Sequence, residues 1–192
     1  LFTDEPVSLD YLSPNTTITG RETHFTLFGD QLFALERLVV GGQTLLPADF
    51  EVNNSGTQLT FTRHFDNAGV NSITAYQGAE TASLIAGLNV TDAISVDTLT
   101  SNNARGADLV SDTQRNEITL KGKGLTGDIQ VYFLADELGD TISDSNKVEY
   151  RNITGGIAFN TPNTLPGTVY HVEIVKPSTQ EHYKVAQSLT AI

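Results

Sequence analysis

Short runs of alternating or β-branched apolar residues dominate this chain, and glycine, asparagine and aspartate close most of them. Runs of this kind are typical of β-strands. They cover residues 23–27, 37–40, 58–62, 71–76, 117–120, 129–134, 147–151, 156–159 and 169–175. No window of 11 or more residues keeps a 3.6-residue period, and the best helical candidate, 30–38, allows a single turn. The pattern therefore predicts an all-β protein.

A motif of the form T-L-x-G-x-x-L occurs twice, at 26–32 and at 119–125, which is an offset of 93 residues. A second matched pair, 59–62 and 157–160, has an offset of 98 residues, and a glycine follows both members at the same distance. An internal repeat indicates two copies of one unit, because each copy must bury its own apolar face. We expect the second copy to carry a slightly longer insertion.

The boundary between the copies is expected between Gly87 and Asp97, after the last strand signal of the first copy. The sequence thus predicts two domains, residues 1–90 and residues 93–192. Each is about the size of one β-sandwich domain.

Several short motifs resemble those of the IPT/TIG family of immunoglobulin-like domains. In the first copy they are Pro14, 25–29, 38–42 and 59–62, with Ala68-Gly69 ahead of Ile73-Thr74. In the second copy they are 118–122 and 159–170, which contains Pro162, Pro166 and Gly167. The first copy departs from the second by carrying Arg63-His64-Phe65 in place of Thr161-Pro162-Asn163. The second copy also resembles the immunoglobulin-like tails found beside HU-like folds in some bacterial proteins.

The resemblance implies two tandem immunoglobulin-like β-sandwich domains. It implies structural roles for Gly29, Gly122, Pro162 and Gly167: the first two would each end a strand at a tight turn, and the Pro-Gly turn would lead into the final hairpin. IPT/TIG domains serve as spacers, as adhesive or protein-binding modules at cell surfaces, as accessory domains of carbohydrate-active enzymes and as dimerisation domains of transcription factors. Fold alone does not choose among these functions.

The net charge of −12 is divided unequally, with −8 over residues 1–92 (3 basic, 11 acidic) and −4 over residues 93–192 (8 basic, 12 acidic). An acidic surface repels phosphate groups at long range, so we expect no nucleic-acid partner. No apolar run approaches the length of a membrane-spanning helix, so we expect no membrane insertion. The partner is expected to be a protein or a glycan.

The chain has no cysteine, which favours a bacterial or phage source over a eukaryotic secreted protein of this size. We expect a location on the cell surface, in the periplasm or in a phage particle, with the cytoplasm as the alternative. The chain has no methionine, even at position 1, and we interpret it as a piece of a longer protein with neighbouring domains.

The densest group of oxygen ligands is Asp136, Glu137, Asp140 and Asp144, with serine and asparagine beside them. Its spacing does not match an EF-hand loop, so we expect a solvated acidic loop with no metal, and a calcium site at Asp136, Asp140 and Asp144 as the alternative. Calcium at millimolar concentration is therefore expected to leave the melting temperature unchanged.

The remaining motifs favour structural over functional interpretations. The G-x-G-x-x-G sequence at 122–127 precedes a strand pattern rather than a helix, so we expect a turn and no dinucleotide site. The four histidines are not spaced as a ligand pair, and we expect no zinc site. Six tyrosines and no tryptophan favour structural roles over a sugar-stacking platform. Nucleophile-elbow, H-E-x-x-H and Walker A motifs are absent from the sequence.

We therefore predict a non-catalytic tandem module without cofactors, which binds a partner or acts as a scaffold through exposed sheet edges and loops. The first alternative is an accessory carbohydrate-binding unit of a glycan-processing system. The second is an immunoglobulin-like appendage of a bacterial nucleoid-associated protein.

Overall fold

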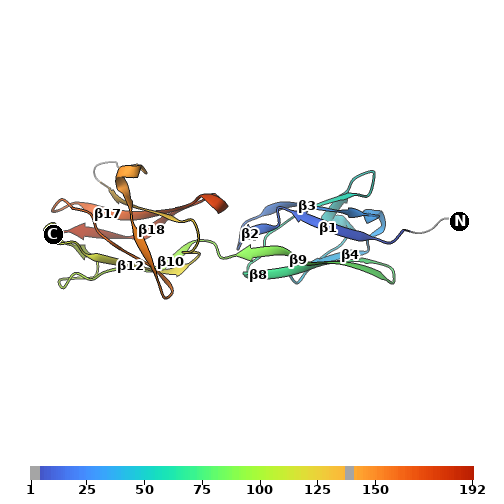
Figure 1. Ribbon diagram of the computed structural model, residues 1–192, viewed down its shortest axis with the longest axis horizontal. Coiled ribbons are helices and arrows are strands. Elements are labelled where there is room, and N and C mark those ends of the chain that lie inside the picture. The colour runs from blue at the N-terminus through green and yellow to red at the C-terminus, as the bar shows by residue number, and fades with distance from the viewer. Residues whose placement is uncertain (1–4, 137–140) are drawn as a thin grey trace. The chain divides into compact units, whose positions relative to one another are not determined.

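The computed structural model describes residues 5–136 and 141–192. Two compact units, Leu1–Asp92 and Ala93–Ile192, divide the chain. Within the described ranges, strands and short 3-10 helices are the only regular structure (Figure 1). The predicted all-β class is confirmed. None of the helices in these ranges has the length and hydropathy needed to cross a membrane.

The described part of the first unit, residues 5–92, contains nine strands and two 3-10 helices. The strands are β1 (Ser8–Ser13), β2 (Thr16–Ile18), β3 (Thr23–Asp30), β4 (Arg37–Val40), β5 (Gln43–Leu45), β6 (Phe50–Val52), β7 (Gln58–Arg63), β8 (Gly69–Gln77) and β9 (Glu80–Thr91), and the 3-10 helices are η1 (Leu32–Ala34) and η2 (Pro47–Asp49). They form a four-stranded sheet in the order β1-β3-β7-β6 and a five-stranded sheet in the order β2-β9-β8-β4-β5. Only the pairing of β2 with β9 is parallel among these described strands.

The described part of the second unit also contains nine strands and two 3-10 helices. The strands are β10 (Ser95–Ser101), β11 (Leu109–Val110), β12 (Glu117–Lys123), β13 (Gln130–Ala135), β14 (Lys147–Val148), β15 (Tyr150–Ile153), β16 (Gly156–Asn160), β17 (Val169–Lys176) and β18 (Glu181–Ala191), and the 3-10 helices are η3 (Asp144–Asn146) and η4 (Pro177–Thr179). The sheets have the orders β10-β12-β16-β15 and β11-β18-β17-β13-β14. Here too one pairing, β11 with β18, is parallel.

Strand for strand, the two units therefore have the same topology. In each, the first two strands belong to different sheets, and the remaining order is that of an immunoglobulin-like sandwich. The registers also agree: Phe25 pairs with Phe61 in the first unit, and Ile118 pairs with Phe159 in the second. The prediction of two tandem immunoglobulin-like β-sandwiches is confirmed.

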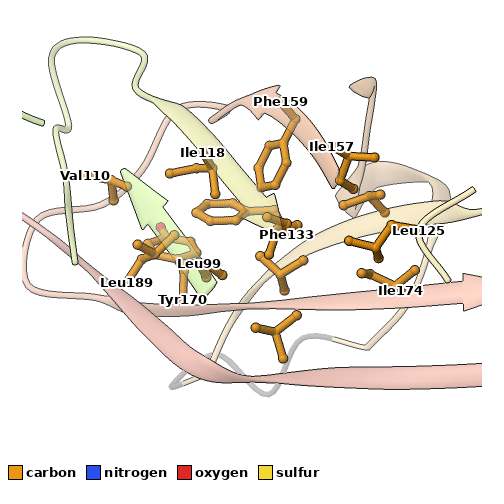
Figure 2. Close-up of a cluster of buried hydrophobic side chains, with 14 of the residues drawn as sticks. Leu99, Val110, Ile118, Leu125, Phe133, Ile157, Phe159, Tyr170, Ile174 and Leu189 are labelled. Carbon is orange, nitrogen blue, oxygen red and sulfur yellow. The ribbon is translucent and has the colours of Figure 1, made fainter. Parts of the chain in front are cut away.

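Alternation along the strands directs one set of side chains into each sandwich. In the first unit, Phe25, Leu27, Leu38, Leu59 and Ile73 are fully buried in one cluster. The second unit has a matching cluster that includes Ile118, Phe133, Phe159, Ile174 and Leu189 (Figure 2). Strands far apart in the sequence contribute to each cluster, so packing between the two sheets holds each unit together.

The glycine shared by the two T-L-x-G motifs has a different role from the one predicted. Gly29 and Gly122 lie within strands β3 and β12 and not at a tight turn. Each is opposite an irregularity in the neighbouring edge strand. A Cβ atom on Gly29 would lie 2.2 Å from the carbonyl oxygen of Ser8, and one on Gly122 would lie 1.9 Å from that of Ser95. These positions need glycine because the edge strand approaches too closely for a side chain.

Candidate functional site

The repeated topology allows one unit to serve as an internal comparison for the other. A feature present in both units at equivalent registers is needed by the fold. A feature present in only one unit is not needed by the fold, and it is a candidate for function. Leu27 and Leu120 belong to the first class, as do Phe61 and Phe159.

The remaining predicted structural residues lie in the connection between β16 and β17. Pro162 is exposed and follows the buried Thr161, whose Oγ1 atom accepts a hydrogen bond from the backbone N–H of Asn116 (3.0 Å). Gly167 has φ of 78°. The backbone N–H of Thr168 donates to the carbonyl of Leu165 (3.1 Å), which closes a type II turn that leads into β17.

The hydroxyl of Tyr170, near the start of β17, accepts a hydrogen bond from the backbone N–H of Leu165 (2.9 Å). This is the geometry of the tyrosine corner of immunoglobulin-like domains. The ring of Tyr170 stacks on Phe133 with a centroid separation of 4.7 Å. In the first unit, the buried Phe65 packs against Phe25 instead, with ring centroids 6.1 Å apart.

The predicted acidic loop is only partly described. Asp136 and Asp144 are placed, with Asp144 exposed at the start of η3, whereas Glu137 and Asp140 lie outside the described residues. Within residues 5–136 and 141–192, no group of three or more histidine, aspartate and glutamate side chains is arranged to hold a metal ion. The G-x-G-x-x-G segment leads into strand β13 and not into a helix, so it lacks the structure of a dinucleotide site.

A network of ionisable side chains covers part of the outer face of the five-stranded sheet in the second unit. Nδ1 of His171 contacts Oδ1 of Asp136, and Nε2 of His171 is 3.2 Å from Oε2 of Glu173. The other oxygen of Glu173 is 3.0 Å from Nε2 of His182. The side chains of His171 and Glu173 are only 10% and 16% exposed. Both ring nitrogens of His171 thus face a carboxylate oxygen, one from Asp136 and one from Glu173.

This network was missed in the sequence, although a signal was present. Glu173 stands two residues after His171, and residues at i and i+2 of a strand lie on the same face. The first unit has nothing comparable at the equivalent register. Thr74 takes the position of Glu173 there, and its hydroxyl is 3.2 Å from that of Ser83. The fold therefore does not need the charged network.

The first unit has its own distinctive feature on the outer face of the four-stranded sheet. Tyr11 of β1 is 53% exposed, and its ring stacks on Phe28 of β3 with centroids 4.4 Å apart and an angle of 13° between the planes. The two residues are paired across the strands. The equivalent pair in the second unit is Thr98 and Lys121. The aromatic pair is thus dispensable for the fold.

A hollow of about 310 Å³ lies on the same sheet face as Tyr11. Its lining residues are His24, Thr60, Phe61 and Thr62 from β3 and β7, and Ala48, Asp49, Phe50 and Glu51 from η2 and β6. Nδ1 of His24 is 3.0 Å from Oγ1 of Thr62. The backbone N–H of Leu46 holds the pKa of Asp49 below its ordinary value, and Arg63, 3.2 Å from Oδ1 of Asp49, lowers it further.

A second open hollow, of about 600 Å³, lies in the second unit between the 102–105 and 111–116 segments. Buried Asn116 forms its floor, with Oδ1 accepting from the backbone N–H of Ser111 (2.7 Å) and Nδ2 donating to Asn102 (3.1 Å). Arg105 and Arg115 are exposed at its edges, together with Asp112. The amides of this hollow are already bonded to one another, so they fix the loops.

No protein-family profile matches this chain, and no curated protein sequence does. Solved structures do match. Titin domains I67 to I69, in an E-to-A mutated variant, match 97% of this chain and 65% of their own length, with a TM-score of 0.52 and 16% identity. The I-band fragment of the same titin domains matches 99% of this chain and 65% of its own length, with a TM-score of 0.49 and 15% identity.

A further match is SGBP-B of the Bacteroides ovatus mixed-linkage glucan utilization locus, solved in complex with a mixed-linkage heptasaccharide. It covers 100% of this chain and 46% of its own length, with a TM-score of 0.38 and 15% identity. This chain therefore spans less than two thirds of the length of each of these three structures. At such identities the similarity to titin establishes an immunoglobulin-like tandem fold and nothing finer.

Proposed function

We propose that this chain is a non-catalytic tandem module of the IPT/TIG type, which binds a partner or acts as a scaffold in a bacterial surface, periplasmic or phage structural protein. One observation carries the proposal. The two units share their interiors, with Leu27 and Leu120 at the same register, but differ on their outer faces, with Tyr11 at the register of Thr98. Functional differences between copies of a sandwich belong on the surface, because the interior is filled by the core.

The ionisable side chains support a non-catalytic role. His171 of the charged network contacts Asp136 and Glu173, and His182 contacts Glu173. His171 and His182 thus each face a carboxylate, and not a serine or threonine hydroxyl that they would activate as a nucleophile, whereas His24, 3.0 Å from the hydroxyl of Thr62, lies on an exposed sheet face of the first unit. The two hollows are open and lined largely by polar side chains, unlike the deep apolar clefts in which most small substrates are bound.

An accessory carbohydrate-binding unit is the second candidate, because one exposed aromatic ring on a polar sheet face suits a sugar ligand. The stacked pair of Tyr11 and Phe28 is the observation that favours it. A nucleoid-associated appendage is disfavoured by the net charge of −12.

Two measurements test the proposal together: the location of the chain in the producing cell or phage, and its ability to turn over chromogenic substrates. Antibodies against the chain should label intact producer cells, the periplasmic fraction or phage particles. The purified chain should not turn over chromogenic glycosides, esters or phosphates above the buffer rate. Turnover that disappears in Glu173→Gln would contradict a non-catalytic role. Signal confined to the cytosol, together with a mobility shift of duplex DNA at physiological salt, would favour the nucleoid alternative instead.

A further inference from the structure

The aromatic pair on the four-stranded sheet of the first unit has the properties of a binding platform. Tyr11 is a large ring with 53% of its surface exposed, although aromatic rings are usually buried in sandwich domains. Phe28, its cross-strand partner, stacks on one face of this ring with centroids 4.4 Å apart and holds it nearly parallel to itself. A ring fixed in this way loses little side-chain entropy when a ligand stacks on its free face.

The residues around this platform offer hydrogen bonds. Gln58 is paired with Phe28 across β3 and β7, and the next row along the face holds Ser13, Thr26 and Thr60. These side chains project from the same face as Tyr11, because residues two apart on a strand share a face. The face therefore combines one apolar plane with a field of hydroxyl and amide groups.

The hollow bounded by η2 continues the same face away from Tyr11. Thr60 belongs to both features, since it lines the hollow and is paired with Thr26 in the row next to the ring. His24 and Thr62 follow one row further and also line the hollow. A ligand that stacks on Tyr11 can thus extend across hydroxyl groups into a recess.

Charge selects the kind of ligand. Asp49 and Glu51 line the hollow, and residues 1–92 carry a net charge of −8. Asp49 is held ionised by the Leu46 N–H group and by Arg63. Carboxylates accept hydrogen bonds from hydroxyl groups but repel anions. The ligand is therefore hydroxyl-rich, has one apolar face and carries no negative charge.

We propose that this face, from Tyr11 to the hollow lined by His24 and Thr60, binds a neutral polysaccharide. One pyranose ring stacks its C–H face on Tyr11, and the adjoining sugars place their hydroxyl groups on Thr26, Thr60 and the hollow. This inference rests on the proposed function, because it names the ligand class of a binding module.

Affinity electrophoresis of the full chain tests the inference. Native gels contain hydroxyethylcellulose, mixed-linkage β-glucan, glucomannan or xylan as neutral probes, and polygalacturonate as the anionic probe. We expect retardation by at least one neutral polysaccharide and none by polygalacturonate. Tyr11→Ala should weaken the binding by about tenfold or more, because the stacking plane is lost. Tyr11→Phe should retain it.

Phe33→Ala is the matched control, since Phe33 is also an exposed aromatic residue of the first unit (58%) but lies in η1. It should bind like the unchanged chain, and thermal melts should show that all three variants are folded. Absence of retardation by every neutral probe, equal binding by Tyr11→Ala, or binding to polygalacturonate alone would each overturn the inference. None of these results depends on enzymatic turnover or on cellular location. Failure of the polysaccharide inference can therefore be distinguished from failure of the proposed function.

Discussion

At the scale of single residues, the space opposite the edge strand decides which side chain is allowed at Gly29 and Gly122. The backbone of the neighbouring strand lies where a Cβ atom would be, so even the smallest side chain forces the edge strand away. Both units keep this contact at the same register. The glycine of the repeat is thus explained by packing between backbones.

Replacing Gly122 with alanine should destabilise the second unit by about 2 kcal/mol, within the range for overpacked sites. The collision is with the carbonyl of Ser95 at 1.9 Å, which is backbone and not a movable side-chain end. Urea unfolding followed by circular dichroism measures the loss. Lys121→Ala, at the neighbouring exposed position of β12, is the control and should change stability by less than about 0.5 kcal/mol. Equal stabilities of the two variants would contradict the steric account.

Asp128 provides a pH test at the same scale. Its Oδ1 atom accepts from the hydroxyl of Ser178 (2.5 Å) and Oδ2 from the backbone N–H of Ser178 (2.8 Å). The hydroxyl contributes most to holding the pKa of Asp128 below its ordinary value of 3.8, followed by the backbone N–H. A lowered pKa in the folded state means that these bonds stabilise the unit above pH 3.8 and are lost as pH falls through the lower folded-state pKa.

Asp128→Asn should therefore lower the melting temperature near neutral pH and flatten its dependence on pH in the acid range. Thermal melts between neutral pH and the acid limit measure both effects. Asp144→Asn is the control, because Asp144 is an exposed acid for which no comparable pair of bonds is present in the described residues. An unchanged acid slope in Asp128→Asn would show that this carboxylate does not contribute to the pH dependence of stability.

Sequence reasoning identified the repeated glycine but not its role, and it missed the charged network. Which strand runs beside Gly29 depends on the pairing of β3 with β1, which lies about 20 residues earlier in the chain and carries no copy of the repeated motif. The contact between His171 and His182 through Glu173 depends on the register of β17 and β18. Neither arrangement follows from spacing within one strand.

At the scale of elements, most predicted runs became strands at nearly the expected positions. The run 37–40 is β4, and the single turn allowed within 30–38 is η1 (Leu32–Ala34). The run 147–151 is interrupted between β14 and β15. These elements were predictable because one of their faces is buried, which imposes the alternating pattern.

The long final strand of the second unit was not predicted, and a break in its alternation explains why. In β18, Tyr183 and Val185 face the core, as does Leu189, but an irregularity in the pairing with β17 lies between them. Gln187, which lies at this irregularity, is polar and exposed where the period-two pattern would have an apolar residue, so the run of alternating apolar residues is interrupted there. The pairing of the equivalent strand β9 with β8 has a similar irregularity.

The corner before β17 gives a test at this scale. Tyr170→Phe removes the acceptor of the Leu165 N–H group and should cost about 1 to 2 kcal/mol, because a backbone donor is left without its partner. Urea unfolding of the second unit measures the cost. Tyr150→Phe is the control, since the described residues provide no hydrogen bond to that hydroxyl. Equal effects of both variants would show that the corner hydrogen bond does not stabilise the unit.

At the scale of the whole molecule, the central feature is one nine-strand module present twice. The two cores consist of separate clusters, one drawn from residues 7–90 and the other from residues 94–191. Separate cores should unfold separately. The domain limits 1–90 and 93–192 remain a prediction, and they are tested by whether the cores are energetically independent.

Differential scanning calorimetry of Phe61→Ala and Phe159→Ala tests this claim most directly. Both side chains are almost fully buried, with 3% and 2% exposure, and removal of either should cost about 3 to 5 kcal/mol. Phe33→Ala, at an exposed site, should leave the trace unchanged. The account predicts that Phe61→Ala lowers the transition of the first unit alone and that Phe159→Ala lowers the transition of the second alone. An equal and concerted loss of both transitions in either variant would contradict it.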